Sequence, residues 1–194
     1  MSGMKITQND VRGRARVWAM APDDPEGAAV LARRIKHPWY RCQALARVAE
    51  FSDGRNRAEL LDAAIQTAQE QDEPNRIVTV SAWPLRVLVD RSPTQAESLV
   101  RRLIRVAQTE PHNLRRAHAL QSLAFAVSRS PLLLGLVVPV MASAILGGHG
   151  WRIDRVIRDT FELVRETHPD LLLPLALHHK ADRQQQKLLA SLPE

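Results

Sequence analysis

The feature of this sequence that most constrains its fold is a short pattern that occurs twice. Arg41-x-x-Ala44-Leu45-x-x-Val48-Ala49 matches Arg116-x-x-Ala119-Leu120-x-x-Leu123-Ala124, seventy-five residues later, which is close to two steps of about 37 to 38 residues. A copy is therefore expected midway, and Ala82-Trp83 is predicted to occupy the position of Ala44-Leu45. Because the apolar residues of each copy are spaced by threes and fours, each copy is predicted to be one amphipathic helix.

Helix-start signals recur with the same period. First helices are expected to begin at Pro38, Pro74, Pro111 and Trp151, and second helices at Asp53-Gly54, Ser92-Pro93, Ser130-Pro131 and His168-Pro169. A serine before a helix can accept a backbone N–H that has no other partner, and a proline at the first helical position gives up only a donor that would be unpaired. Four helix pairs fit the chain. Pro84 is expected to kink or split one helix near Ala82.

The period and the motif from Pro38 to Ala49 resemble the helical repeats of many bacterial scaffold proteins, between the TPR-like and HEAT-like classes of α-solenoid. The resemblance implies an all-α domain over residues 25–194, in which about four antiparallel helix pairs stack into a right-handed superhelix. Residues 1–24 are expected to form an N-terminal tail or a capping helix, with Val11, Ala15, Trp18 and Met20 on its packing face.

Composition agrees with closely packed helices. The 194 residues are 45% apolar but only 4% aromatic, and no stretch alternates apolar and polar residues for long enough to predict a strand. The single cysteine, Cys42, has no disulfide partner, which favours a reducing, cytoplasmic location. The N-terminus lacks the apolar core of a signal peptide, and no apolar run reaches the roughly 20 residues needed to span a bilayer, so no membrane partner is expected.

The formal net charge of +6 comes mostly from arginine, because lysine occurs only at positions 5, 36, 180 and 187. Arginine forms bidentate contacts with carboxylates and phosphates, so the excess can mark an acidic partner; a purely compositional origin is the alternative. The most basic stretch lies between residues 101 and 130, where Glu110 is the only carboxylate. The candidate binding surface consists of Arg101, Arg102, Arg105, Arg115, Arg116, Arg152, Arg155 and Arg158.

Motifs for catalysis are missing from the sequence. The seven histidines lie apart from any cysteine pair or His-Glu-x-x-His motif, and there is no nucleophile elbow or phosphate-binding loop. We therefore expect no metal, no cofactor and no enzymatic activity. One remote alternative comes from a resemblance to alkylpurine DNA glycosylases with HEAT-like repeats, which use a basic surface, tryptophans and an aspartate. Trp151 and Asp154, beside Arg155 and Arg158, are the corresponding residue types.

Two binding functions remain, and the favoured one is a protein-interaction scaffold. Stacked helix pairs create an extended surface that such repeats use to hold partner proteins, here a partner with acidic groups. The alternative is sequence-independent binding of nucleic acid through an arginine-lined groove. Residues 131–146 contain no charged side chain, so this segment is either covered by neighbouring helices or part of an interface, with a homodimer as the simplest case.

Overall fold

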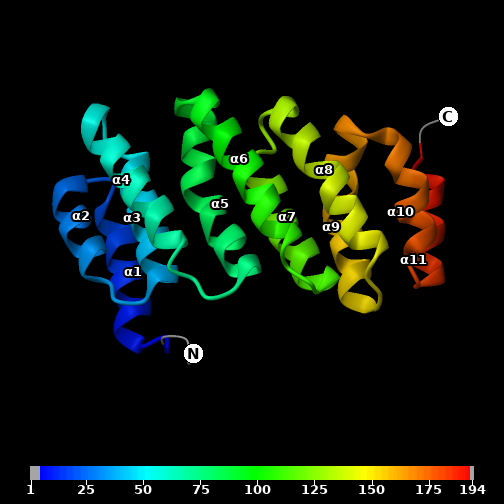
Figure 1. Ribbon diagram of the computed structural model, residues 1–194, viewed down its shortest axis with the longest axis horizontal. Coiled ribbons are helices and arrows are strands. Elements are labelled where there is room, and N and C mark those ends of the chain that lie inside the picture. Colours follow the sequence, from blue (N-terminus) through cyan, green and yellow to red (C-terminus); the bar gives the residue numbers. More distant parts are fainter. Residues whose placement is uncertain (1–4, 193–194) are drawn as a thin grey trace. The chain divides into compact units, whose positions relative to one another are not determined.

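The computed structural model describes residues 5–192, and every regular element within that range is a helix (Figure 1). The elements are α1 (Gln8–Met20), α2 (Pro25–Arg34), α3 (Pro38–Glu50), α4 (Gly54–Ala68), α5 (Pro74–Arg91), α6 (Pro93–Gln108), α7 (Asn113–Ala126), α8 (Pro131–Leu146), α9 (Trp151–Thr167), the 3-10 turn η1 (Pro169–Leu171), α10 (Leu172–His178) and α11 (Asp182–Ala190). The prediction of an all-α fold is confirmed for the described residues.

Proline marks the first residue of five helices, which are α2, α3, α5, α6 and α8. Three of these helices also have a side-chain cap, and before α3 the His37 ring accepts the Trp39 N–H at 3.2 Å. The Asp24 carboxylate accepts the Gly27 N–H at 2.8 Å before α2, and the Ser130 hydroxyl accepts the Leu133 N–H at 3.4 Å before α8. The predicted helix starts at residues 38, 54, 74, 93, 131 and 151 are therefore confirmed. The start expected at Pro111 lies two residues later, at Asn113.

The last predicted second helix does not start at His168-Pro169. A 3-10 turn occupies Pro169–Leu171, α10 begins only at Leu172, and α11 follows as a separate helix. Pro174 explains the late start, because proline is tolerated in an α-helix mainly in the first turn, where its missing N–H would be unpaired in any case. Beginning at Leu172 places Pro174 in that first turn.

The chain forms two compact units, one ending at Ala96 and the other beginning at Glu97, in the first turn of α6. In the first unit α3 is the central helix and packs against α1, α2, α4 and α5 (Figure 1). In the second unit α7 packs against α8 and α9, α9 also contacts η1 and α10, and α11 packs on α10. Each unit buries a core of alanine and branched aliphatic side chains.

The sequence pattern corresponds to the buried positions of the first helices. Ala44, Leu45, Val48 and Ala49 of α3 are buried, as are Ala119, Leu120, Leu123 and Ala124 of α7. The predicted register of the middle copy is wrong by two residues, since Val80, Ser81, Pro84 and Leu85 are the buried quartet of α5, whereas Ala82 and Trp83 are half-buried. In α9 the corresponding quartet is Val156, Ile157, Thr160 and Phe161.

Pro84 does not split α5, which runs from Pro74 to Arg91 as one helix. A proline nitrogen cannot donate to the carbonyl four residues earlier, here that of Val80. The Cys42 thiol of α3 instead lies 3.5 Å from the Val80 oxygen and donates to it. Burial raises the pKa of Cys42 well above its ordinary value, although Arg41 opposes the shift, so this donor keeps its proton.

The face of α1 that packs inward differs from the predicted one. Val11 and Ala15 are exposed, whereas Asp10 and Val17 are buried. Asp10 is buried because its carboxylate accepts the backbone N–H groups of Lys36 and His37 at 3.1 and 3.0 Å, which ties α1 to the turn before α3. Burial alone raises the pKa of Asp10, but hydrogen bonds from Thr7, His37 and Lys36 together lower it to about 2.

Most of the uncharged helix α8 is covered. Eight of its side chains are buried, and α7, α9 and α10 pack against it. Leu132 is 70% exposed, and Pro139 and Ser143 are exposed about two and three turns further on. A narrow uncharged stripe thus faces outward, and the homodimer contact stays a prediction. No helix within residues 5–192 is long and apolar enough to cross a membrane.

Candidate functional site

The most unusual side-chain arrangement of the first unit is a set of stacked arginines and aromatic rings. It extends over α1, α3 and α5, and we call it the aromatic–arginine cluster. Its members are Arg14, Trp18, Tyr40, Arg47, Glu50, Phe51, Trp83 and Arg86. Phe51 is the C-cap of α3, and the other members lie within the three helices.

Trp18 of α1 and Trp83 of α5 form the centre of the cluster. Their ring centroids are 5.3 Å apart and their planes are nearly perpendicular, at 85°, which is the favoured edge-to-face geometry. Both rings are half-buried, so each keeps part of its surface open to solvent. The pair joins two helices that both flank α3.

Guanidinium groups cover the aromatic rings of the cluster. Arg14 lies 5.7 Å from the Trp18 centroid and 5.4 Å from that of Tyr40. Arg47 lies 5.8 Å from the Trp18 centroid and 4.4 Å from that of Phe51, and Arg86 lies 5.2 Å from that of Trp83. These distances fall within the range of cation–π attraction, so the rings help to hold three positive charges at one surface.

A single carboxylate bridges two of these arginines. Glu50 forms ion pairs with Arg47, and with Arg86 at 2.7 Å, while Arg14 donates to the Gln43 amide oxygen at 3.2 Å. Three guanidiniums against one carboxylate leave an excess of two positive charges. The Nε of Arg47 is buried and has no hydrogen-bond partner within residues 5–192. This arrangement can bind an anionic group and an apolar side chain next to each other.

The sequence interpretation missed this cluster, although a local signal for it exists. Arg14 and Trp18 are four residues apart, as are Arg47 and Phe51, and Trp83 and Arg86 are three apart. Residues with these spacings lie on one face of a helix. An arginine–aromatic pair at this spacing in each of α1, α3 and α5 would have identified the surface.

The predicted arginine surface lies in the second unit, and the structure divides it. Arg101, Arg102 and Arg105 of α6 are exposed, and Arg101 pairs with Glu97 at 2.8 Å. Arg115 is exposed on α7, whereas Arg116 donates to Asn113 in its own helix, which in turn donates to the Gly147 carbonyl. Arg116 therefore supports the turn before α9.

Arg152 and Arg155 lie together in a groove between α7 and α9, with a volume of about 290 Å³. We call it the α7/α9 groove, and its lining residues are His118, Gln121, Trp151, Arg152, Arg155, Val156 and Asp159. Trp151 is 68% exposed, and the Arg152 guanidinium lies 5.2 Å from its ring centroid. Arg155 pairs loosely with Asp159 at 3.6 Å. Arg158 is exposed but does not line the groove.

Asp154 does not share the groove with Trp151. It is buried, and its carboxylate accepts the Lys180 N–H at 3.2 Å, so it fixes the turn before α11. The residue pair needed for the glycosylase alternative is therefore not brought together, and the geometry gives that alternative no support.

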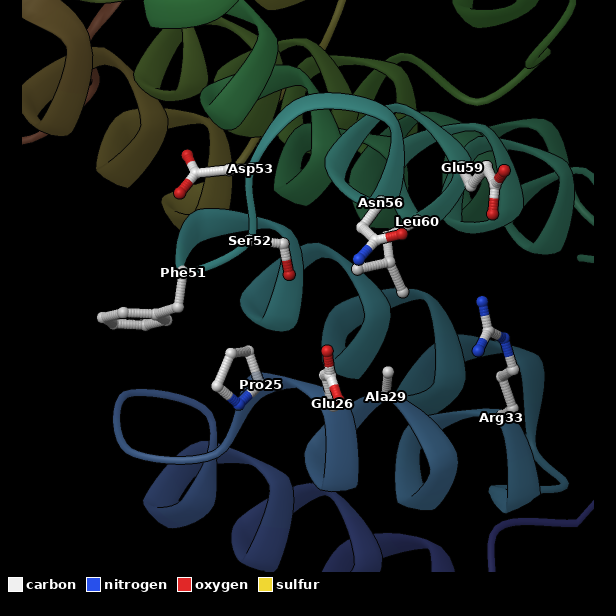
Figure 2. Close-up of a pocket in the computed structure, with 10 residues that line it drawn as sticks. All are labelled: Pro25, Glu26, Ala29, Arg33, Phe51, Ser52, Asp53, Asn56, Glu59 and Leu60. Atoms are coloured by element: carbon white, nitrogen blue, oxygen red, sulfur yellow. The ribbon is translucent and has the colours of Figure 1, made fainter.

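Another concave region lies between α2 and α4 of the first unit, with a volume of about 400 Å³ (Figure 2). Glu26 and Arg33 extend from α2 toward α4 across a floor that includes Ala29 and Leu60. Asp53 and Glu59 add two carboxylates, but each is already paired, with Arg57 at 2.7 Å and Arg55 at 2.8 Å.

Comparison with known proteins gives no relative. No protein-family model matches the chain. No curated protein is significantly similar to it, and neither is any solved structure. Function is therefore argued from the geometry alone.

Proposed function

We propose that this chain is a non-catalytic binding module, an α-solenoid of about four helix pairs in a right-handed superhelix, that holds a partner protein bearing acidic groups. The buried quartets of α3, α5, α7 and α9 support the repeat, because they begin at positions 44, 80, 119 and 156. A buried, reduced Cys42 is compatible with the cytoplasmic location that we also propose.

The observation that carries the proposal is the aromatic–arginine cluster. Tryptophan, tyrosine and arginine are the residues that most often dominate the binding energy of protein interfaces. Here they are prearranged by stacking and ion pairs, so little side-chain entropy is lost when a partner binds. The two excess positive charges favour a partner segment with carboxylates, which can replace or extend the contacts of Glu50.

The same cluster favours a protein over single-stranded nucleic acid. Bases bind such surfaces by stacking on open aromatic faces. Guanidinium groups already lie against Trp18, Tyr40 and Trp83, which leaves these faces less available for bases. Carboxylates, by contrast, can reach the outward N–H groups of the same guanidiniums.

The test compares two fluorescent probes, a peptide rich in aspartate and glutamate and an oligothymidylate, by anisotropy over a range of salt concentrations. We expect the peptide to bind more tightly, and the double substitution Arg14→Gln and Arg86→Gln to weaken it by about tenfold or more. The matched control, Arg12→Gln with Arg91→Gln, removes two exposed charges of α1 and α5 outside the cluster and should change affinity little. Tighter binding of the oligothymidylate, with a steep salt dependence, would reject the proposal in favour of nucleic acid.

A further inference from the structure

The α7/α9 groove of the second unit has features of an anion site that are independent of the aromatic–arginine cluster. Arg152 and Arg155 enter it from one turn of α9, and His118 and Gln121 enter it from one turn of α7. Four side chains with nitrogen donors thus line a space of about 290 Å³, large enough for one side chain or a small ligand. The exposed Trp151 ring provides an apolar wall at its edge.

The charges around His118 come from both walls of the groove. On α9 they are Arg152, Arg155 and Asp159; on α7, Arg115 lies one turn before His118. The helix α8 also packs against α7, and it contains no ionisable side chain. Partial burial lowers the pKa of His118, Arg152 and Arg155 lower it further, and Asp159 opposes them. The empty groove therefore favours a neutral imidazole.

Charge balance indicates which anion fits. With His118 neutral, Arg152 and Arg155 against Asp159 give the groove one net positive charge; protonated His118 gives it two. A dianion that binds between the arginines offsets their effect on the imidazole and raises the pKa of His118. A phosphate monoester is such a dianion near neutral pH, and its three terminal oxygens can accept from several donors at once, whereas a carboxylate has one charge and two oxygens.

We infer that the α7/α9 groove binds a phosphate monoester, with Arg152 and Arg155 on its oxygens, His118 as a third donor that becomes protonated on binding, and Trp151 against the group that carries the phosphate. A phosphorylated side chain and a mononucleotide share this chemistry. The inference goes beyond the proposed function and does not rest on it, because the two sites have no residue in common.

The test follows the His118 imidazole by nuclear magnetic resonance at constant ionic strength, with inorganic phosphate, O-phosphoserine, adenosine monophosphate and acetate as separate probes. The His118→Gln variant identifies the His118 signal. We expect phosphate probes, but not acetate, to raise the pKa of His118 and to bind more tightly as the pH falls from about 8 toward 6.5. The stronger of the two organic probes identifies the carrier.

Substitutions distinguish a specific phosphate site from nonspecific attraction by positive charge. Arg152→Gln and Arg155→Gln should each weaken phosphate binding by about tenfold or more. Arg158→Gln, the matched control on the same helix, lies outside the groove and should leave binding unchanged. An unshifted His118, an equal response to acetate, or an equal loss with Arg158→Gln would each overturn the inference. None of these outcomes bears on the aromatic–arginine cluster, which the Arg14→Gln and Arg86→Gln pair tests separately.

Discussion

The aromatic–arginine cluster and the α7/α9 groove occupy equivalent positions of their helices, but different residue types stand at those positions. Gln43 of α3 and His118 of α7 each directly precede the buried quartet of their helix, and Trp83 of α5 and Asp159 of α9 lie at the same place within theirs. In the first unit, Gln43 is bonded to Arg14 and Trp83 packs on Trp18. In the second unit, His118 and Asp159 line an open groove.

This difference shows how one helical framework can carry two kinds of surface. In the cluster, large aromatic rings of α1, α3 and α5 pack together and fix the arginines. This surface should therefore contribute to stability as well as binding. Shorter polar side chains leave a groove in which Arg152 lies over the exposed Trp151 ring and Arg155 has only a weak pair with Asp159. We therefore expect substitutions in the cluster to change stability, and substitutions in the groove to change mainly binding and protonation.

The largest contrast is expected between two tryptophans. Trp18→Ala should destabilise the protein by about 2–3 kcal/mol, because it removes the edge-to-face contact with Trp83 and the ring beneath Arg14 and Arg47. Trp151→Ala should cost about 0.5 kcal/mol or less, since that ring is mostly exposed. Urea unfolding followed by circular dichroism measures both. Equal losses would show that the two surfaces do not differ in this way.

The second prediction concerns the loss of stability in acid that Asp10 of the first unit causes. The pKa of Asp10 is about 2 in the folded protein, against an ordinary 3.8, so its charge stabilises the folded state above pH 3.8. That stabilisation, about 2 kcal/mol, is lost as the pH falls from 3.8 toward 2. Asp10→Asn should remove this part of the acid response, and urea unfolding at several pH values measures it.

The control for Asp10 is Asp23→Asn, at an exposed carboxylate in the turn after α1. This variant keeps Asp10 and should therefore lose stability in acid as the unchanged protein does. If the Asp10→Asn protein loses as much stability between these pH values as the unchanged protein, the hydrogen bonds to Lys36 and His37 do not have the assigned effect.

The next contrast concerns two ion pairs. Glu50→Gln should cost about 1 kcal/mol, because Glu50 is one-fifth exposed and serves both Arg47 and Arg86. Asp159→Asn should change stability by less than about 0.5 kcal/mol, since the Arg155–Asp159 pair is exposed and long. The same unfolding measurement applies. A larger loss of stability for Asp159→Asn than for Glu50→Gln would show that the groove, and not the cluster, contributes more to stability.

Local signals predicted much of the fold. The prolines at positions 38, 74, 93 and 131 act within one helical turn, so they marked helix starts without any knowledge of packing. The buried quartets of α3 and α7 were also readable from their spacing. The register of α5 was not readable from the sequence. Ala82 and Trp83 resemble the repeated pattern but are half-buried, whereas Ser81 and Pro84 do not resemble it and are buried.

The candidate sites were less predictable, because they depend on contacts between helices. The cluster forms only because α1 and α5 both pack against α3. Its arginines stack on aromatic rings, whereas the sequence interpretation treated arginines only as charges. Asp10 is buried through backbone groups of a turn 26 residues away, which no periodicity of α1 reveals. Of the predicted arginines, Arg152 and Arg155 were the pair that the fold brought into a groove.

The smallest expected effect is a shift in the titration of His118, and it tests the groove without any ligand. Arg155→Gln should raise the pKa of His118, because the guanidinium disfavours the imidazolium, and Asp159→Asn should lower it, because the carboxylate favours the imidazolium. Nuclear magnetic resonance titration of the imidazole measures both shifts, with Arg158→Gln as the neutral comparison. Arg155→Gln and Arg158→Gln remove the same charge from the same helix, so a larger shift for Arg155→Gln would show that Arg155 faces His118 and Arg158 does not. Equal shifts for the two arginine variants would instead reflect net charge, and the groove would then be no more organised than the rest of the arginine-rich surface.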